Sequence, residues 1–140
     1  MTYIDTTEQP ITINGIEESA ITNYFATINQ EKFDQTAALF AVDGELLAPF
    51  EQPIVGRKAI ASYLSKEAKG MKLLPKQGKS ELGENDLEQI HVTGKVKTAL
   101  FGVNVAWYFN LNQARQITSA KIKLLASPQE LLGLKQKGST

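Results

Sequence analysis

The 140-residue sequence contains no cysteine and only one histidine. These absences exclude disulfide bonds, zinc–thiolate sites, thiol catalysis and a histidine-rich metal site. Basic and acidic side chains number 15 each, so the formal net charge is zero. Nucleic-acid-binding domains usually show a basic excess, so the balance argues against a nucleic-acid partner. A net charge near zero also permits the chain to associate with itself.

The sequence also lacks long apolar runs, and none approaches the roughly 18 residues that a membrane-spanning helix needs. Its N-terminus has neither the basic region nor the apolar stretch of a signal peptide. Hydrophobic residues make up 42% and charged residues 21% of the chain, which is typical of a globular domain. We therefore expect one soluble, cytoplasmic domain.

The first half of the chain predicts three helices. Apolar residues recur at helical spacing over 16–28, 31–40 and 57–68. Asp43 and Gly44 indicate a turn between the second helix and a short strand at 45–48. Pro53 and Gly56 indicate a loop before the third helix.

The second half changes to the two-residue alternation of half-buried strands. Strands are predicted over 89–100, 103–111 and 118–124, together with one that begins at 71–74 and that Pro75 and Gly78 interrupt or bend. Ser127, Pro128 and Glu130 form a capping box, which predicts a last helix over 128–134. This helix is either a lid that moves when ligand binds or a permanently docked element. We divide the chain into an arm at 1–15, a domain at 16–135 and a polar tail at 136–140.

Helices followed by an antiparallel meander indicate an α+β fold. The long strands with interrupting proline and glycine predict a strongly curved sheet. Such a sheet, wrapped around the N-terminal helices, leaves a cone with an apolar interior. Apolar cavities of this kind are natural sites for small molecules.

Five stretches of the sequence carry a resemblance to a known family: 21–25, 37–40, 53–56, 102–107 and 122–132. Together they resemble the C-terminal domain of the orange carotenoid protein, and more closely the stand-alone C-terminal-domain-like carotenoid proteins of cyanobacteria. The resemblance implies the NTF2-like cone, in agreement with the α+β interpretation. It extends over nearly the whole chain, from about residue 12 to 135.

The resemblance implies that Tyr24 and Trp107 donate hydrogen bonds to the carbonyl oxygen of a ketocarotenoid of the canthaxanthin or echinenone type. A phenol O–H and an indole N–H are donors on large apolar bodies, which suits a carbonyl in an apolar pocket. From spacing alone, both residues are more simply core residues. The resemblance also implies a set of residues near the ligand tunnel, each of which could equally be plain core: Leu73, Thr98, Phe101, Val105, Ile117, Ile122 and Leu124.

The resemblance further implies partners. A domain of this length is about 30–40 Å across, so we expect it to bury about half of one carotenoid. Either a second copy in a homodimer that shares one carotenoid or a helical carotenoid protein would cover the rest. Glu67 lies where the family's domain meets its helical partner, although a solvated helix charge would explain it equally well. A membrane is expected only transiently, as the carotenoid source.

Two departures from the family pattern concern these contacts. Leu100 stands where a second tryptophan is common, and no cysteine is present to link two subunits, so any dimer is non-covalent. The helical N-terminal carotenoid domain is also absent, so we expect this chain not to be the complete photoswitch.

Three functions follow. The first is a non-catalytic carotenoid carrier and transfer protein that quenches singlet oxygen in photoprotection. The second is an isomerase or dehydratase of the same fold, for which the candidate acid–base residues are Asp43, Glu45, Glu51 and His91. The alternation around His91 places it on the outer face. The third is an interaction domain that exposes Val105 and Trp107 to a protein partner.

Overall fold

The computed structural model describes residues 11–84 and 87–125. Within these ranges it has three helices and six strands, in the order α1 (Ser19–Asn29), α2 (Phe33–Ala38), β1 (Phe40–Leu47), β2 (Ile54–Val55), α3 (Arg57–Glu67), β3 (Lys72–Leu82), β4 (Glu88–Lys97), β5 (Gly102–Leu111) and β6 (Ile117–Leu125). Residues 1–10 of the predicted arm, the predicted helix at 128–134 and the tail lie outside the described residues.

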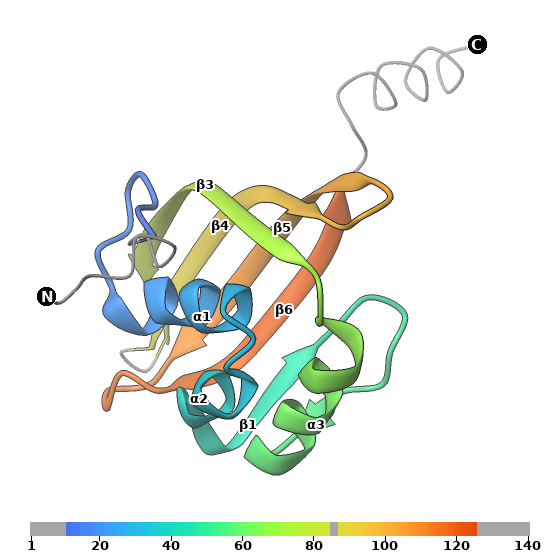
Figure 1. Ribbon diagram of the computed structural model, residues 1–140. Coiled ribbons are helices and arrows are strands. Elements are labelled where there is room, and N and C mark those ends of the chain that lie inside the picture. The colour runs from blue at the N-terminus through green and yellow to red at the C-terminus, as the bar shows by residue number, and fades with distance from the viewer. Residues whose placement is uncertain (1–10, 85–86, 126–140) are drawn as a thin grey trace, which may run out of the picture.

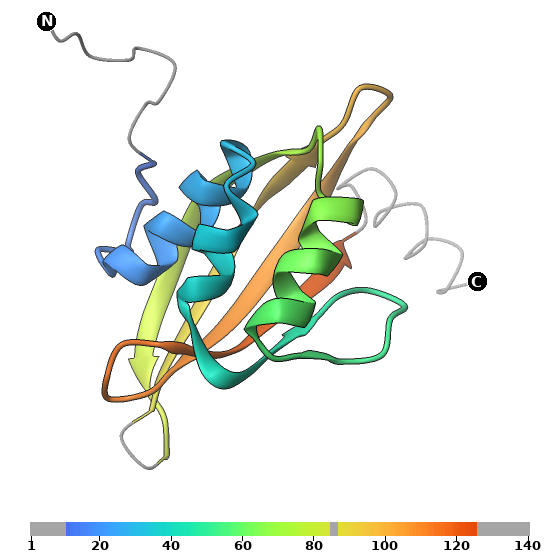
Figure 2. The ribbon, with the colours of Figure 1, turned by 60° about the horizontal axis from the view of Figure 1, so that its bottom comes forward.

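The six strands form one sheet in the order β2-β1-β6-β5-β4-β3. Strands β3 to β6 form the predicted antiparallel meander, whereas β1 runs parallel to β6. All three helices lie on the concave face of this curved sheet, with α1 over β3 and α3 over β1 (Figure 1; Figure 2). The predicted α+β cone is confirmed.

The alternation in β5 sorts its side chains between the two faces of the sheet. Val105, Trp107 and Phe109 are buried beneath the helices, and Tyr108 projects from the outer face. His91, on β4, is opposite Tyr108, and the two rings stack with their centroids 4.4 Å apart. His91 therefore faces outward, as predicted from its alternation with lysines along the strand.

The sheet bends where β3 meets β4. The register between these strands shifts at Pro75, and opposite this bulge stands Gly94, where a Cβ atom would lie 2.3 Å from the carbonyl oxygen of Leu74. Only glycine allows so close an approach. Pro75 was predicted to interrupt or bend the strand; it bends it, and β3 continues to Leu82. An edge strand tolerates this, because a proline there removes no hydrogen bond from a central ladder.

Several predicted boundaries were wrong. The first helix begins at Ser19 instead of Ile16, and the second ends at Ala38 because Phe40 already belongs to β1. Strand β1 is longer than the predicted 45–48, and the predicted loop before α3 contains the short strand β2. β4 ends at Lys97, where the Thr98 hydroxyl turns the chain.

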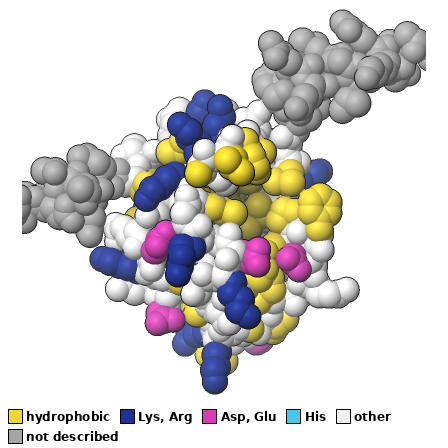
Figure 3. Space-filling model, turned by 45° about the vertical axis from the view of Figure 1, so that its right-hand side comes forward, with side chains coloured by type: hydrophobic (Ala, Val, Ile, Leu, Met, Phe, Trp, Pro, Cys, Tyr) yellow, Lys and Arg dark blue, Asp and Glu magenta, His cyan; other side chains and the backbone are white. Residues whose placement is uncertain are grey.

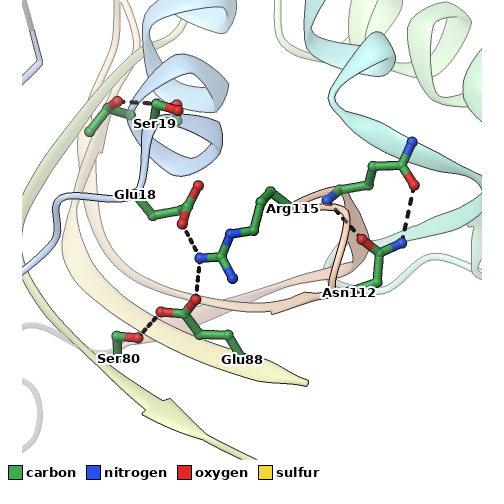
Figure 4. A network of polar contacts seen from close by, with 8 residues as sticks. Glu18, Ser19, Ser80, Glu88, Asn112 and Arg115 are labelled. Atoms are coloured by element: carbon green, nitrogen blue, oxygen red, sulfur yellow. Dashed lines mark hydrogen bonds and ion pairs between the residues drawn. The ribbon is translucent and has the colours of Figure 1, made fainter. Parts of the chain in front are cut away.

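A polar network joins four parts of the chain at the end of the sheet where the β5–β6 turn lies. The guanidinium of Arg115 pairs with the carboxylates of Glu18 and Glu88, and the hydroxyl of Ser80 donates to Glu88 (Figure 4). The network therefore ties the start of α1 to strands β3 and β4 and to the turn. None of the helices within the described ranges is long and apolar enough to cross a membrane.

Candidate functional site

A cavity of about 290 Å³ opens between the helices and the concave face of the sheet. Hydrophobic side chains gather around this hollow on the surface (Figure 3). Helices α1 and α3 supply one wall, and strands β4, β5 and β6 supply the other. The lining includes Tyr24, Ile28, Leu46, Tyr63, Leu64, Glu67, Met71, Leu73, Val96, Thr98, Phe101, Val103, Val105, Trp107, Ile122 and Leu124.

All the residues that the resemblance placed at the tunnel line this cavity, except Ile117. Ile117 is fully buried at the start of β6, where it pairs with Phe40 and Leu111. It therefore packs in the core and does not line the cavity, unlike the other residues of the predicted set. Glu67 lies on the cavity wall and is exposed.

Tyr24 and Trp107 are each about 1% exposed and are held by packed aromatic rings. The Trp107 ring meets Phe25 at 88° with centroids 4.7 Å apart, and Tyr24 meets Phe109 at 78° and 5.0 Å. Phe25 also meets Tyr24 edge-on at 5.2 Å. One phenylalanine thus contacts both predicted donors and fixes their rings relative to each other.

Within the described part of the chain, neither the Tyr24 hydroxyl nor the Trp107 indole N–H makes a hydrogen bond to protein. No side-chain nitrogen or oxygen there is both fully sealed and without a partner. The two donor atoms therefore reach the open space of the cavity that both residues line. Burial, and next the neighbouring Tyr63, raise the pKa of Tyr24, so its hydroxyl keeps its proton at neutral pH.

Three other polar side chains line the cavity, and one of them, Thr98, already makes hydrogen bonds to the backbone. The Thr98 hydroxyl donates to the Phe101 carbonyl at 3.1 Å and accepts from the backbone N–H groups of Leu100 and Phe101. Tyr63 and Glu67 stand one turn apart on α3 and make no hydrogen bond within the described residues. The helical pattern had placed Tyr63 on an apolar face, and the resemblance did not single it out.

Asn29, the last residue of α1, shapes the cavity wall at Leu73. Its side-chain amide donates to the Leu73 carbonyl at 2.9 Å and accepts from the Leu73 N–H at 2.7 Å. This pair of bonds fixes the start of β3 against the end of α1. No sequence motif indicated it, because the two residues are 44 positions apart.

The candidate acid–base residues lie away from the cavity wall. His91 is on the outer face, Asp43 is in the exposed part of β1, and Glu45 pairs with Val55. Glu51 is exposed and lies near Tyr63, whose pKa it helps to raise. The idea that Val105 and Trp107 present an exposed strand face was also wrong, because each is about 1% exposed.

Chemically, the site is an apolar hollow with two fixed hydrogen-bond donors deep inside and a half-buried phenol and a carboxylate further out. It suits a hydrophobic molecule that carries an acceptor atom at the end that enters first. Within the described residues no cluster of three or more potential metal ligands occurs.

The chain is similar to known proteins in sequence. The chain is 41% identical over 128 residues to the orange carotenoid-binding protein of Limnospira maxima, and 40% identical over 126 residues to that of a Synechocystis species. These matches cover 89% and 87% of this chain. The chain spans only 40% of the length of either relative.

The chain is also similar to solved structures. The Orange Carotenoid Protein of an Anabaena (Nostoc) species, solved binding canthaxanthin, matches with a TM-score of 0.83 and 41% identity, over 91% of this chain and 42% of that one. A protein from Sphaerobacter thermophilus matches with a TM-score of 0.62 and 24% identity, over 77% of this chain and 94% of that one, and shows the fold alone.

The family model of the Nuclear transport factor 2 (NTF2) domain matches residues 16–120, which include α1 and all strands but the end of β6. The chain therefore belongs to the NTF2 domain family.

Proposed function

We propose that this protein is a non-catalytic ketocarotenoid-binding protein that carries and transfers its pigment and quenches singlet oxygen in photoprotection. The observation that carries the proposal is the pair of buried donors, Tyr24 and Trp107, that reach a mainly apolar cavity without a hydrogen-bond partner among the described residues. The names of the similar proteins, which bind carotenoid or were solved with canthaxanthin, support the choice of ligand.

The donor set fits a ketocarotenoid of the canthaxanthin or echinenone type. Such a pigment is an apolar polyene whose end ring carries one carbonyl oxygen. Leaving that oxygen unpaired in an apolar site would cost a few kcal/mol, and two donors remove this cost. Hydrogen bonds to the carbonyl also draw electron density along the polyene, so we expect the absorption of the bound pigment to shift to the red.

The size of the cavity supports a shared ligand. Its volume is about 290 Å³, just below the range of about 300–1,000 Å³ that is typical of pockets for drug-sized ligands. A carotenoid is much longer than a drug-sized ligand. The pigment would therefore extend past the rim, where Leu100, Phe101 and Leu124 are exposed by 87%, 60% and 45%. A second copy, or a helical carotenoid protein that meets the rim near Glu67, would cover it.

Pigment exchange completes the proposal. The protein would take a ketocarotenoid from a membrane during a transient contact and pass it to the helical carotenoid protein. The same conjugated polyene would quench singlet oxygen while it is bound. An exposed apolar rim serves such exchange, because the half of the pigment outside the cavity is accessible to an acceptor.

The test is uptake of canthaxanthin by the purified protein, followed by visible absorption and size-exclusion chromatography. We expect a red-shifted band that co-elutes with a dimer and that collapses in the double variant Tyr24→Phe/Trp107→Phe. Tyr108→Phe, on the outer face, is the matched control and should keep the band. A protein that stays colourless, or a double variant with the unchanged spectrum, contradicts the proposal.

A further inference from the structure

The cavity has a second polar region that the pair of buried donors does not explain. Tyr63 and Glu67 lie four residues apart on α3, a spacing that brings both side chains to one face of the helix, and both line the cavity. Thr98, the remaining polar side chain of the lining, uses its hydroxyl in the 98–101 turn. Tyr63 and Glu67 are thus the polar wall groups left to contact a ligand besides Tyr24 and Trp107.

The two regions of the wall differ in what they offer. An indole N–H only donates, and a carboxylate only accepts, while a phenol does both. Deep in the cavity, Tyr24 and Trp107 therefore suit a carbonyl oxygen. At the rim, the Glu67 carboxylate suits a group that donates a hydrogen bond. Tyr63, half-buried on the cavity wall, can both donate and accept.

Tyr63 lines the same cavity of about 290 Å³ as Tyr24 and Trp107, so a ligand ring in this cavity shares a small space with all three side chains. Burial, and next the Tyr63 phenol, raise the pKa of Tyr24. Burial, and next the carboxylates of Glu51 and Glu67, raise the pKa of Tyr63. The Tyr63 hydroxyl thus stays protonated, and its electrostatic neighbours are Tyr24 on the inner side and carboxylates on the outer side. Because Tyr24 and Tyr63 line one small cavity, Tyr63 is the wall group available to a substituent next to a carbonyl that Tyr24 holds.

We propose that Tyr63, positioned by Glu67, is a specificity-determining residue that selects an end ring with a hydroxyl group next to its keto group. This inference rests on the proposed carotenoid binding and specifies its ligand class. The ring hydroxyl would donate to the phenol oxygen of Tyr63, while the phenol proton is directed toward the Glu67 carboxylate. A ring with the keto group alone would leave both groups without this contact.

The experiment compares two pigments that differ only in this substituent. Canthaxanthin has a keto group on each ring, and astaxanthin has a hydroxyl next to each keto group. Each is titrated into the pigment-free protein, and the dissociation constant is read from the visible absorption. One additional hydrogen bond corresponds to about tenfold in affinity, so we expect astaxanthin to bind about tenfold more tightly than canthaxanthin.

The ratio of the two dissociation constants is the readout for the variants. We expect Tyr63→Phe to bring it to about one and Glu67→Gln to lower it, whereas Tyr108→Phe on the outer face keeps the wild-type ratio. A wild-type ratio of one, or a tenfold ratio that persists in Tyr63→Phe, overturns the inference and leaves the proposed function standing. Failure of the wild type to bind either pigment overturns both.

Discussion

The rings of Phe25 and Trp107 meet at nearly a right angle, with centroids 4.7 Å apart, so a residue of α1 determines the orientation of the indole on β5. Because Phe25 also contacts Tyr24 and Phe109, the two donors of the cavity are positioned by the same side chain. The geometry of the site thus depends on a residue that is fully buried and that is not among the cavity-lining residues.

Phe25→Leu should disturb the site while it keeps an apolar core. The variant loses the edge-on contacts to three rings, each worth about 0.5–1.5 kcal/mol, so we expect the free energy of unfolding to fall by about 1.5–4.5 kcal/mol. Trp107 is the single tryptophan, so its fluorescence reports the site directly and should shift to the red. Phe50→Leu, at a side chain that is 97% exposed, is the control; an unchanged emission in Phe25→Leu would contradict the role of Phe25.

Asn29→Asp tests the two hydrogen bonds between Asn29 and Leu73 that fix β3 to α1. The carboxylate cannot donate to the Leu73 carbonyl, so two oxygens would face each other. We expect a loss of about 1–3 kcal/mol at neutral pH, measured by urea unfolding. Stability should partly return below about pH 4, because the protonated carboxyl is again a donor. Asn23→Asp, at an exposed position on the same helix, should show neither effect.

Gly94→Ala tests the bend in the sheet. The new methyl group would lie 2.3 Å from the Leu74 carbonyl oxygen and 2.7 Å from the Pro75 Cα atom, both of which are backbone and cannot rotate away. Overpacking of this kind costs about 1–3 kcal/mol, and the flattened bend should also weaken canthaxanthin uptake. At Gly102 the added atom would meet the Lys95 and Lys97 side chains and the Val96 carbonyl oxygen at 3.5–3.7 Å, which is ordinary van der Waals contact. A Gly94→Ala protein as stable as Gly102→Ala would disprove this account of the bend.

The pH dependence of stability should contain a contribution from Glu88. The hydrogen bond from Ser80, and then Arg115, hold the pKa of Glu88 below its ordinary value of 4.5, against the opposing effect of partial burial. A lowered pKa means that the folded state binds this proton less readily than the unfolded chain. The stabilisation is therefore present above pH 4.5 and is lost as the pH falls below that value.

Melting temperatures of the wild type and Glu88→Gln, measured from about pH 3 to about pH 7 across the ordinary titration range of carboxyl groups, test this contribution. The variant should be less stable than the wild type at neutral pH, and the difference should shrink toward the acid end. Glu81→Gln, at an exposed position on β3, provides the comparison. Parallel curves for the wild type and Glu88→Gln would show that the network has no such effect.

Local patterns in the sequence predicted what depends on neighbouring residues. The alternation in 103–111 correctly buried Val105 and Trp107 on one face and placed Tyr108 on the other. Local patterns did not predict the parallel pairing of β1 with β6. Phe40 and Ile117 are far apart in the sequence, and nothing in either segment indicates that the other is its partner. Strand β2 has only two residues and depends on its pairing with β1.

The candidate site divides in the same way. Tyr24 and Trp107 came from a family resemblance, because spacing alone could not separate a ligand contact from a core residue. Asn29 and Tyr63 came from the structure: the first acts through a partner 44 residues away, and the second depends on which face of α3 borders the cavity. Ile117, which the resemblance placed near the tunnel, does not line the cavity, because alternation within β6 does not reveal where the cavity ends along the strand.

The parallel pairing of β1 with β6 also affects how the protein matures during synthesis. β1 is synthesised well before β6, so Phe40 finds its partner only when Ile117 follows. Pairings between such distant segments form slowly, and until then the apolar face of β5 has no neighbour on the β6 side. The cavity wall that β5 and β6 form is therefore completed only after β6 has been synthesised, so the cavity is formed late in synthesis of the described part of the chain.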